Sequence, residues 1–212
     1  MRALTERQYR RREKILAAAR DLITKHGYTG VTMRELAAKA NVTPKTLYHQ
    51  FGNKEKLLRI AVEERFRHTY QAIDNHPVKK GIDKLFFIID SVADSTRKNQ
   101  AYAQALSPLT ASHAEDPFLG IRLSTYRRAL EQIEEEGDFE DWVDVGILSH
   151  VIYRNVHPLY PTWYGARRAK PEEFSKYNAS LVLLSMTTGY TQQQARKMVD
   201  SMQKSLLALD SR

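Results

Sequence analysis

Two helix starts only ten residues apart constrain this chain more than any other feature. Both lie in the stretch NVTPKTLYHQFGNKEKLL at residues 41–58. Thr43 followed by Pro44 is a typical cap and first-turn pair, and Asn53 is a typical cap for the helix that comes next. The short helix between the two starts offers only Leu47 as an inward-facing anchor. Because such a helix cannot build a core of its own, we expect its polar side chains to serve a contact outside the protein.

A second short helix directly precedes this one. Residues 32–35, Thr-Met-Arg-Glu, form a capping box, in which the threonine oxygen accepts from the glutamate amide and the carboxylate reaches back. Asn41 suits the left-handed turn between the two helices. A longer helix is expected before them, from about residue 9 to residue 26, and Gly27 is a natural stop. Two helices joined by a turn of three or four residues, the second polar and exposed, describe a helix-turn-helix.

The positive charge of the chain is confined to the same region. The chain has 212 residues and a formal net charge of +8, with 33 Lys and Arg against 25 Asp and Glu. Residues 1–56 contain 13 of these cations but only five of the anions, so they carry the whole excess. A positive field on one small module is typical of a protein that binds a polyanion, although a basic, solvated helix face is the alternative on charge alone.

A fourth helix follows the polar one and is expected to end near Pro77, because proline disfavours helix in the residue before it. We interpret this helix as a rigid connector. The predicted domains are therefore a helix-turn-helix DNA-binding domain at residues 1–50, a connecting helix at 51–76, and a third, helical domain at 77–212. The exposed helix would fit the major groove of B-DNA, which is about 12 Å wide.

The segment VTMRELAAKANVTPKTLYHQFGNKEKLL resembles the helix-turn-helix of the TetR (tetracycline repressor) family. The resemblance covers about residues 9–60. Three positions depart from the family pattern: Asn41 replaces a turn glycine, Thr43 replaces a serine cap, and Gln50 stands where His or Tyr is common. The matching positions are Thr32, Leu36-Ala37, Ala40, Val42, Leu47-Tyr48, Phe51, Lys54 and Leu57.

The resemblance implies a set of DNA-binding residues. Thr32 and Tyr48 would contact phosphates and Lys54 would help to hold the DNA backbone. The residues that would face bases are Arg34, Lys45, Thr46 and His49. Each residue also has an ordinary structural alternative: Thr32 as a helix cap, Tyr48 as a partly buried ring, and His49 as a solvated surface histidine. The candidate DNA-binding residues are Thr32, Arg34, Thr43, Pro44, Lys45, Thr46, Tyr48, His49 and Lys54.

The remaining three quarters of the chain predict further helices without strand alternation, so the fold class is all-α. Pro108 should kink or end the helix predicted at 99–113. Two late helices, within about residues 141–188, are apolar on more than one side and therefore need partners on both sides. One partner is expected to be a second copy of the chain. In the resembled family such dimers place two recognition helices about one DNA turn, ~34–36 Å, apart on a palindromic operator.

A ligand pocket is the other expectation for this region. Arg154 lies among apolar residues, and a charge buried there needs a partner. We weigh two partners: a carboxylate, Asp90 or Asp94, which is the preferred one, and an acidic small molecule. Aromatic residues such as Trp163 could line a cavity but are more often core residues. The candidate ligand-binding residues are Tyr102, Phe118, Tyr126, His150, Tyr153, Arg154 and His157.

No catalytic signature accompanies these residues. His150, Arg154 and His157 share one helix face, but an arginine between two histidines makes a poor metal site. We therefore expect no enzyme activity, no metal and no cofactor. The absence of cysteine and of a long apolar run favours a soluble, cytoplasmic protein without a membrane partner. The resemblance implies a transcriptional regulator, preferably a repressor released by a small molecule. The alternatives are an activator and a DNA-bound interaction protein without a small-molecule effector.

Overall fold

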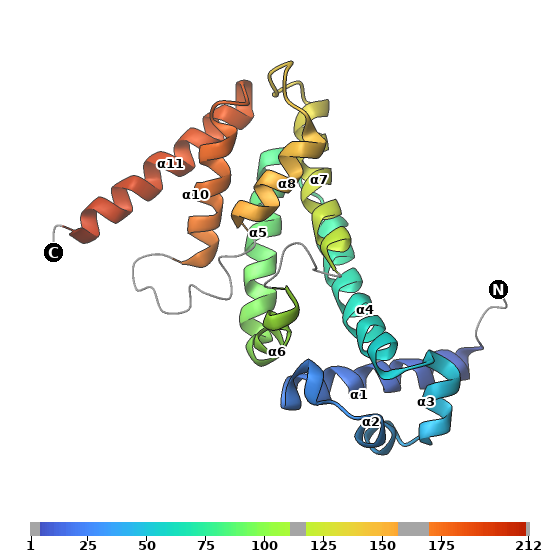
Figure 1. Ribbon diagram of the computed structural model, residues 1–212. Helices are drawn as coiled ribbons and strands as arrows, with labels where there is room; N and C mark the ends of the chain where they lie inside the picture. Colours follow the sequence, from blue (N-terminus) through green and yellow to red (C-terminus); the bar gives the residue numbers. More distant parts are fainter. Residues whose placement is uncertain (1–4, 111–117, 157–169, 211–212) are drawn as a thin grey trace. The chain divides into compact units, whose positions relative to one another are not determined.

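The computed structural model describes residues 5–110, 118–156 and 170–210, and the elements in these ranges are α-helices. An isolated antiparallel bridge joins Phe139 and Thr187. The predicted all-α class is confirmed. Figure 1 labels the helices. None of the described helices combines the length and apolar character that crossing a bilayer would require.

The chain forms two compact units. The first comprises residues Met1–Thr69 and Asn99–Glu115, and the second comprises residues Tyr70–Lys98 and Asp116–Arg212. The first unit contains α1 (Glu6–Gly30), α2 (Met33–Ala40), α3 (Pro44–Phe51), most of α4 (Lys54–Asp74) and α6 (Gln100–Thr110). The second contains the end of α4 together with α5 (Gly81–Lys98), α7 (Leu119–Glu135), α8 (Val145–Val156), α10 (Pro171–Leu183) and α11 (Gly189–Asp210).

Helix α1 is the centre of the first unit, because both α2 and α6 pack against it. It begins at Glu6, three residues before the predicted start, since Thr5 and Gln8 form a capping box that the sequence analysis overlooked. Regular helix ends at Gly27, as predicted, where φ is +74°. The apolar residues buried at the centre of this unit include Ile15, Leu16, Ala19, Ile23, Leu36, Leu47, Phe51, Leu57 and Leu58.

Helix α6 packs with the first unit, although the predicted domain boundaries place its residues in the third domain. The helix continues through Pro108 to Thr110. Tyr102 on α6 is buried, and the guanidinium of Arg65 on α4 lies 4.9 Å from its ring centroid. Burial raises the pKa of Tyr102 to about 12, while the charge of Arg65 opposes that rise. Helix α6 is therefore held against both α1 and α4 within this unit.

The second unit is a bundle in which α5 packs against α7 and α10, and α10 packs against α8 and α11. Gly81, the first residue of α5, lies directly against the backbone of α7 at Ala129 and Ile133. Asp138 holds the start of α11, because its carboxylate accepts a hydrogen bond from the Thr191 amide at 2.8 Å. The buried residues of this unit include Ile82, Leu85, Ile89, Tyr126, Leu130, Ile133, Ile152, Tyr153, Leu183 and Ala195.

Candidate nucleic-acid interface

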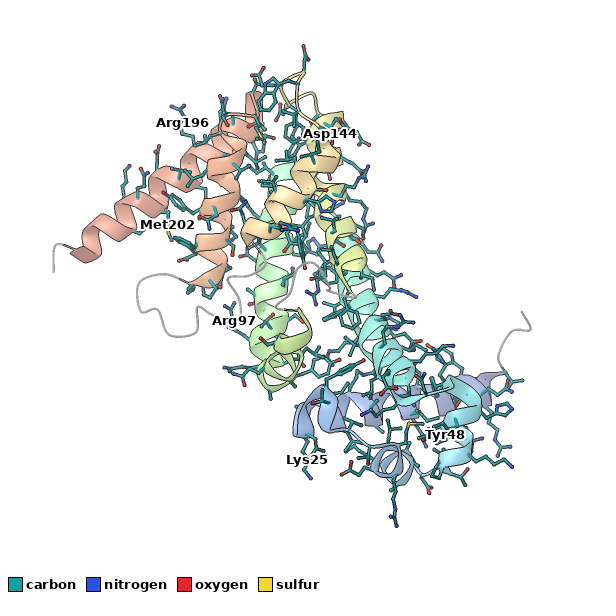
Figure 2. All side chains as sticks on the ribbon, in the orientation of Figure 1. Lys25, Tyr48, Arg97, Asp144, Arg196 and Met202 are labelled. Carbon is teal, nitrogen blue, oxygen red and sulfur yellow. The ribbon has the colours of Figure 1, made fainter. Side chains whose placement is uncertain are left out.

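Helix α3 has one buried side and one exposed polar side. Leu47 and Phe51 are buried, as predicted, and they fasten the helix to the first unit. Lys45, Tyr48 and His49 are exposed, and the Tyr48 side chain retains 52% of its accessible surface. Figure 2 labels Tyr48 on this helix. The partly buried alternative for Tyr48 is therefore wrong, and the outward polar face that the sequence predicts is present.

The turn between α2 and α3 has the predicted geometry. Asn41 adopts the left-handed conformation with φ at +54° and ψ at +51°. The Val42 amide donates to the Ala37 carbonyl at 3.0 Å, which closes the end of α2. Asparagine tolerates this conformation better than most residues other than glycine, because its short side chain can hydrogen-bond locally. The substitution of Asn41 for the family's glycine therefore preserves the turn.

Three side chains meet at the start of α3. The Thr43 hydroxyl accepts from the Thr46 amide at 3.2 Å, so Thr43 is the predicted N-cap, followed by Pro44 in the first turn. The two threonine hydroxyls lie 3.0 Å apart. The guanidinium of Arg11 on α1 donates to the Thr46 hydroxyl at 3.3 Å. Sequence reasoning missed this contact, because nothing in the local pattern relates two residues that are 35 positions apart.

The candidates outside α3 flank that helix in the chain. The Thr32 hydroxyl caps α2 and also donates to the Glu35 carboxylate at 2.7 Å. Hydrogen bonds from Thr32 lower the pKa of Glu35, so the capping alternative for Thr32 is observed. Arg34 on α2 is exposed. Lys54, at the start of α4, is half-buried and its ammonium donates to the Thr29 carbonyl at 3.4 Å.

Gln50 differs from its neighbours on α3. It is half-buried, and its Oε1 atom is enclosed without a hydrogen-bond partner among the described residues. The family pattern favours His or Tyr at this position.

Comparison with known proteins agrees with this geometry. A family model for bacterial regulatory proteins of the tetR family matches residues 15–60, which contain α2, α3 and the capped start of α4. The chain is similar to the HTH-type transcriptional repressor KstR of Rhodococcus jostii, with 29% identity over 100 residues that cover 47% of each chain. The helix-turn-helix region of this chain is thus similar to that of tetR-family regulatory proteins.

Two further proteins are similar to this chain, one in sequence and one in fold. IcaR, the negative transcriptional regulator of the biofilm operon icaADBC in Staphylococcus epidermidis, is 29% identical over 107 residues, covering 49% of this chain and 58% of IcaR. The chain spans about half the length of the curated relatives it matches. The crystal structure of FadR from Bacillus subtilis with stearoyl-CoA has a TM-score of 0.64 at 18% identity, covering 80% of this chain and 96% of FadR. That likeness shows the fold.

The printed names of these similar proteins describe one class of activity. The matched family model is one of bacterial regulatory proteins, and KstR and IcaR are named as a transcriptional repressor and a negative transcriptional regulator. Among the described residues, no three His, Asp or Glu side chains gather in a way that could hold a metal ion.

The candidate ligand-binding residues are divided between the two units. Tyr102 belongs to the first unit, whereas Phe118, Tyr126 and Tyr153 are buried in the second. Tyr126 and Tyr153 meet edge to face, with ring centroids 5.8 Å apart. His157 and Trp163 lie outside the described residues. Only part of the predicted set therefore comes together in the second unit.

The expectation that Arg154 is buried is wrong. Arg154 and His150 are both exposed on α8. Neither carboxylate weighed as a partner serves Arg154, because Asp90 pairs with Lys176 at 2.6 Å and Asp94 pairs with Arg97 at 2.5 Å. The error arose because α8 is apolar on two sides, so its hydrophobic pattern does not indicate which side faces the core.

Among the described residues of the second unit, the buried arginine is Arg122, which sequence reasoning overlooked. Arg122 is only 2% exposed, and its guanidinium donates a hydrogen bond to the Tyr153 hydroxyl at 3.3 Å. Arg122 lies on α7 one turn before Tyr126, so both side chains face the same interior. The spacing of Arg122 with the apolar residues Tyr126, Ala129 and Ile133 was the signal that could have revealed it.

Proposed function

We propose that this chain is a transcriptional regulator that binds double-stranded DNA by inserting α3 into the major groove. The exposed polar face of α3 carries this proposal. Lys45, Tyr48 and His49 extend from a helix that is anchored only by its opposite side. A major groove accepts an α-helix, and polar side chains there can distinguish base pairs. The local excess of cations would draw the same surface toward the phosphate backbone.

Individual roles follow from the position of each side chain. We assign Lys45 and His49 to base edges, because both are exposed on α3. Tyr48 would contact a phosphate through its hydroxyl, and Lys54 would do so at the start of α4. Thr46, whose hydroxyl lies beside the capping hydroxyl of Thr43, would also face bases. Arg34 on α2 completes the base-facing set, and Thr32 and Pro44 border it.

Binding of the wild-type chain to duplex DNA tests the proposal directly. Randomised duplexes are selected on the protein, and the affinity of the selected sequence is then measured over a range of salt concentrations. We expect the logarithm of the association constant to fall linearly with the logarithm of salt concentration, with a slope of about −0.9 for each phosphate contact. Failure to retain any duplex at low salt would contradict the proposal.

We further propose that the chain acts as a dimer through α8 and α10. Ile147 and Val151 lie one turn apart on the exposed side of α8, and the Ile147 side chain retains 68% of its accessible surface. Leu181 on α10 is also exposed, and α10 packs against α8. A second copy that covers these residues would remove their apolar surface from water. A two-fold dimer would read a palindromic operator.

The exposed face of α8 predicts the effect of a charge in this interface. Ile147→Glu is expected to shift the chain from dimer to monomer, because an unpaired carboxylate is costly to bury against an apolar partner. The oligomeric state is measured by light scattering after size-exclusion chromatography. Tyr9→Glu is the control, since Tyr9 is an exposed aromatic residue of the first unit, with 53% of its surface accessible. A dimer that survives Ile147→Glu would place the interface elsewhere.

A small molecule bound in the second unit would regulate DNA binding in this proposal. The support is the match of residues 15–60 to the tetR family model and the likeness in fold to FadR, whose structure contains stearoyl-CoA. Helix α6 would couple the two activities, because it follows α5 after one residue and packs on α1. The ligand would favour a dimer whose recognition helices no longer match the groove spacing. A compound that raises the melting temperature but leaves DNA affinity unchanged would contradict this coupling. Action on an operator implies a cytoplasmic location.

A further inference from the structure

The first half of α1 carries a row of cations on one face. Arg7, Arg11 and Lys14 are spaced by four and three residues, which places them on the same side of the helix. All three are exposed. We propose that this face, the α1 cation row, is a second phosphate-binding surface for duplex DNA, with Arg11 as its central contact. The inference rests on the proposed DNA-binding function and extends its surface beyond the helix-turn-helix.

Neighbouring acids pair with Arg10 and Arg12, the arginines on either side of Arg11, whereas no described ion pair involves Arg11. Arg10 pairs with Glu6 at 2.5 Å, on the same exposed side of α1. Arg12 pairs with Glu64 of α4 at 2.6 Å and lies over the Phe51 ring. Among the described residues, the hydrogen-bond partner of the Arg11 side chain is a neutral hydroxyl rather than a carboxylate. Its full positive charge therefore remains available to an anion.

The position of Arg11 connects this charge to the recognition helix. Its Nη2 atom donates to the Thr46 hydroxyl at 3.3 Å, in the first turn of α3. A guanidinium has five N–H donors in a planar fork, so one bond to a threonine leaves donors for phosphate oxygens. The backbone amides at the start of α3 carry a partial positive charge that favours the same anion.

An exposed cation on a helix is ordinarily just solvated. Arg11 differs because it is tethered to the helix proposed to enter the groove, which lowers the conformational freedom that a long side chain loses on binding. The adjacent arginines, by contrast, are held by carboxylates on α1 and α4. The contrast between Arg10 and Arg11 supplies a matched pair of variants on consecutive positions of one helix.

Arg11→Gln separates a phosphate contact from a purely structural role. Glutamine keeps a donor for Thr46 but removes the charge, so a residue that only positioned Thr46 would tolerate it. We expect Arg11→Gln to weaken binding to all duplexes by about tenfold at moderate salt. The salt slope should become shallower by about 0.9. The preferred base sequence should stay unchanged, because phosphate contacts carry no direct sequence information.

The controls separate failure of this inference from failure of the proposed function. Arg10→Gln should weaken binding and flatten the salt slope less than Arg11→Gln, because Arg10 is already paired with Glu6. Adding Lys14→Gln to Arg11→Gln should flatten the slope by a similar amount again. Melting temperatures of all variants confirm that the fold is retained.

Specific outcomes would overturn the inference while leaving the proposed function intact. A wild-type chain that binds DNA with a steep salt slope, together with an Arg11→Gln variant of the same slope, excludes the phosphate contact. Equal effects of Arg10→Gln and Arg11→Gln would mean that only the overall charge of α1 matters. That result would overturn the assignment of Arg11 as a specific phosphate contact. A double variant with the slope of Arg11→Gln alone would exclude the row. Loss of DNA binding by the wild-type chain would instead reject the proposed function itself.

Discussion

Replacing Lys45 and His49 together by alanine is expected to remove most of the sequence preference while the fold remains intact. Both side chains are exposed on α3, so their removal creates no cavity. A good side-chain contact to a base edge contributes about 1–3 kcal/mol of discrimination. Two such contacts therefore amount to a loss on the order of 100-fold in affinity for the preferred site. Competition binding between the selected duplex and an unrelated duplex measures the effect.

A matched control distinguishes base recognition from loss of charge. Lys25→Ala removes one exposed cation near the C-terminal end of α1, where Figure 2 labels it. This variant should leave the preference for the selected DNA sequence unchanged. Binding of the Lys45 and His49 double variant to unrelated duplexes should fall only severalfold, because one phosphate-attracting charge is lost. If the double variant retains the preference of the wild type, α3 does not read the bases.

Gly81→Ala is expected to destabilise the chain by about 3 kcal/mol, near the upper end of what overpacking a tight contact costs. A Cβ atom at Gly81 would lie 2.4 Å from the Ile133 Cγ1 atom. It would also lie 2.7 Å from the Ile133 amide nitrogen and 2.8 Å from the Ala129 carbonyl oxygen. The side chain of Ile133 could rotate, but backbone atoms cannot yield unless α5 and α7 separate.

Gly120→Ala provides the control for Gly81→Ala. Gly120 also lies in a helix of the second unit, yet a Cβ atom there would meet nothing within 4 Å. Because alanine is the better helix former, Gly120→Ala should stabilise the chain by up to about 1 kcal/mol. Urea denaturation followed by circular dichroism gives both free energies of unfolding. Equal stabilities of the two variants would mean that α5 and α7 are not in close contact at Gly81.

Much of the helix-turn-helix could be predicted because the sequence signals for its helix ends are local. The capping box of Thr32 and Glu35, the left-handed Asn41 and the cap at Thr43 each involve residues within a few positions of one another. Such interactions form wherever the segment becomes helical, so the sequence reveals them directly. The one missed helix start, at Thr5, followed the same rule and was simply overlooked.

The errors in the second unit have a different physical origin. Hydrophobic periodicity shows that a residue lies on an apolar side of a helix, but α8 has two such sides. Arg154 was therefore expected in the interior, while the buried arginine is Arg122 on α7. Which side is covered depends on the neighbouring helices, and those neighbours are distant in sequence.

By itself, the sequence determined the helical class, the positions of the helix caps in the helix-turn-helix and the polar face of α3. These follow from backbone hydrogen bonding and side-chain spacing over one or two turns. Only the tertiary structure decided that Arg11 donates a hydrogen bond to Thr46, that α6 packs with the first unit, and that α7 lies directly against Gly81. Each of these contacts joins segments far apart in the chain. Their geometry depends on how whole helices pack, which no local pattern specifies.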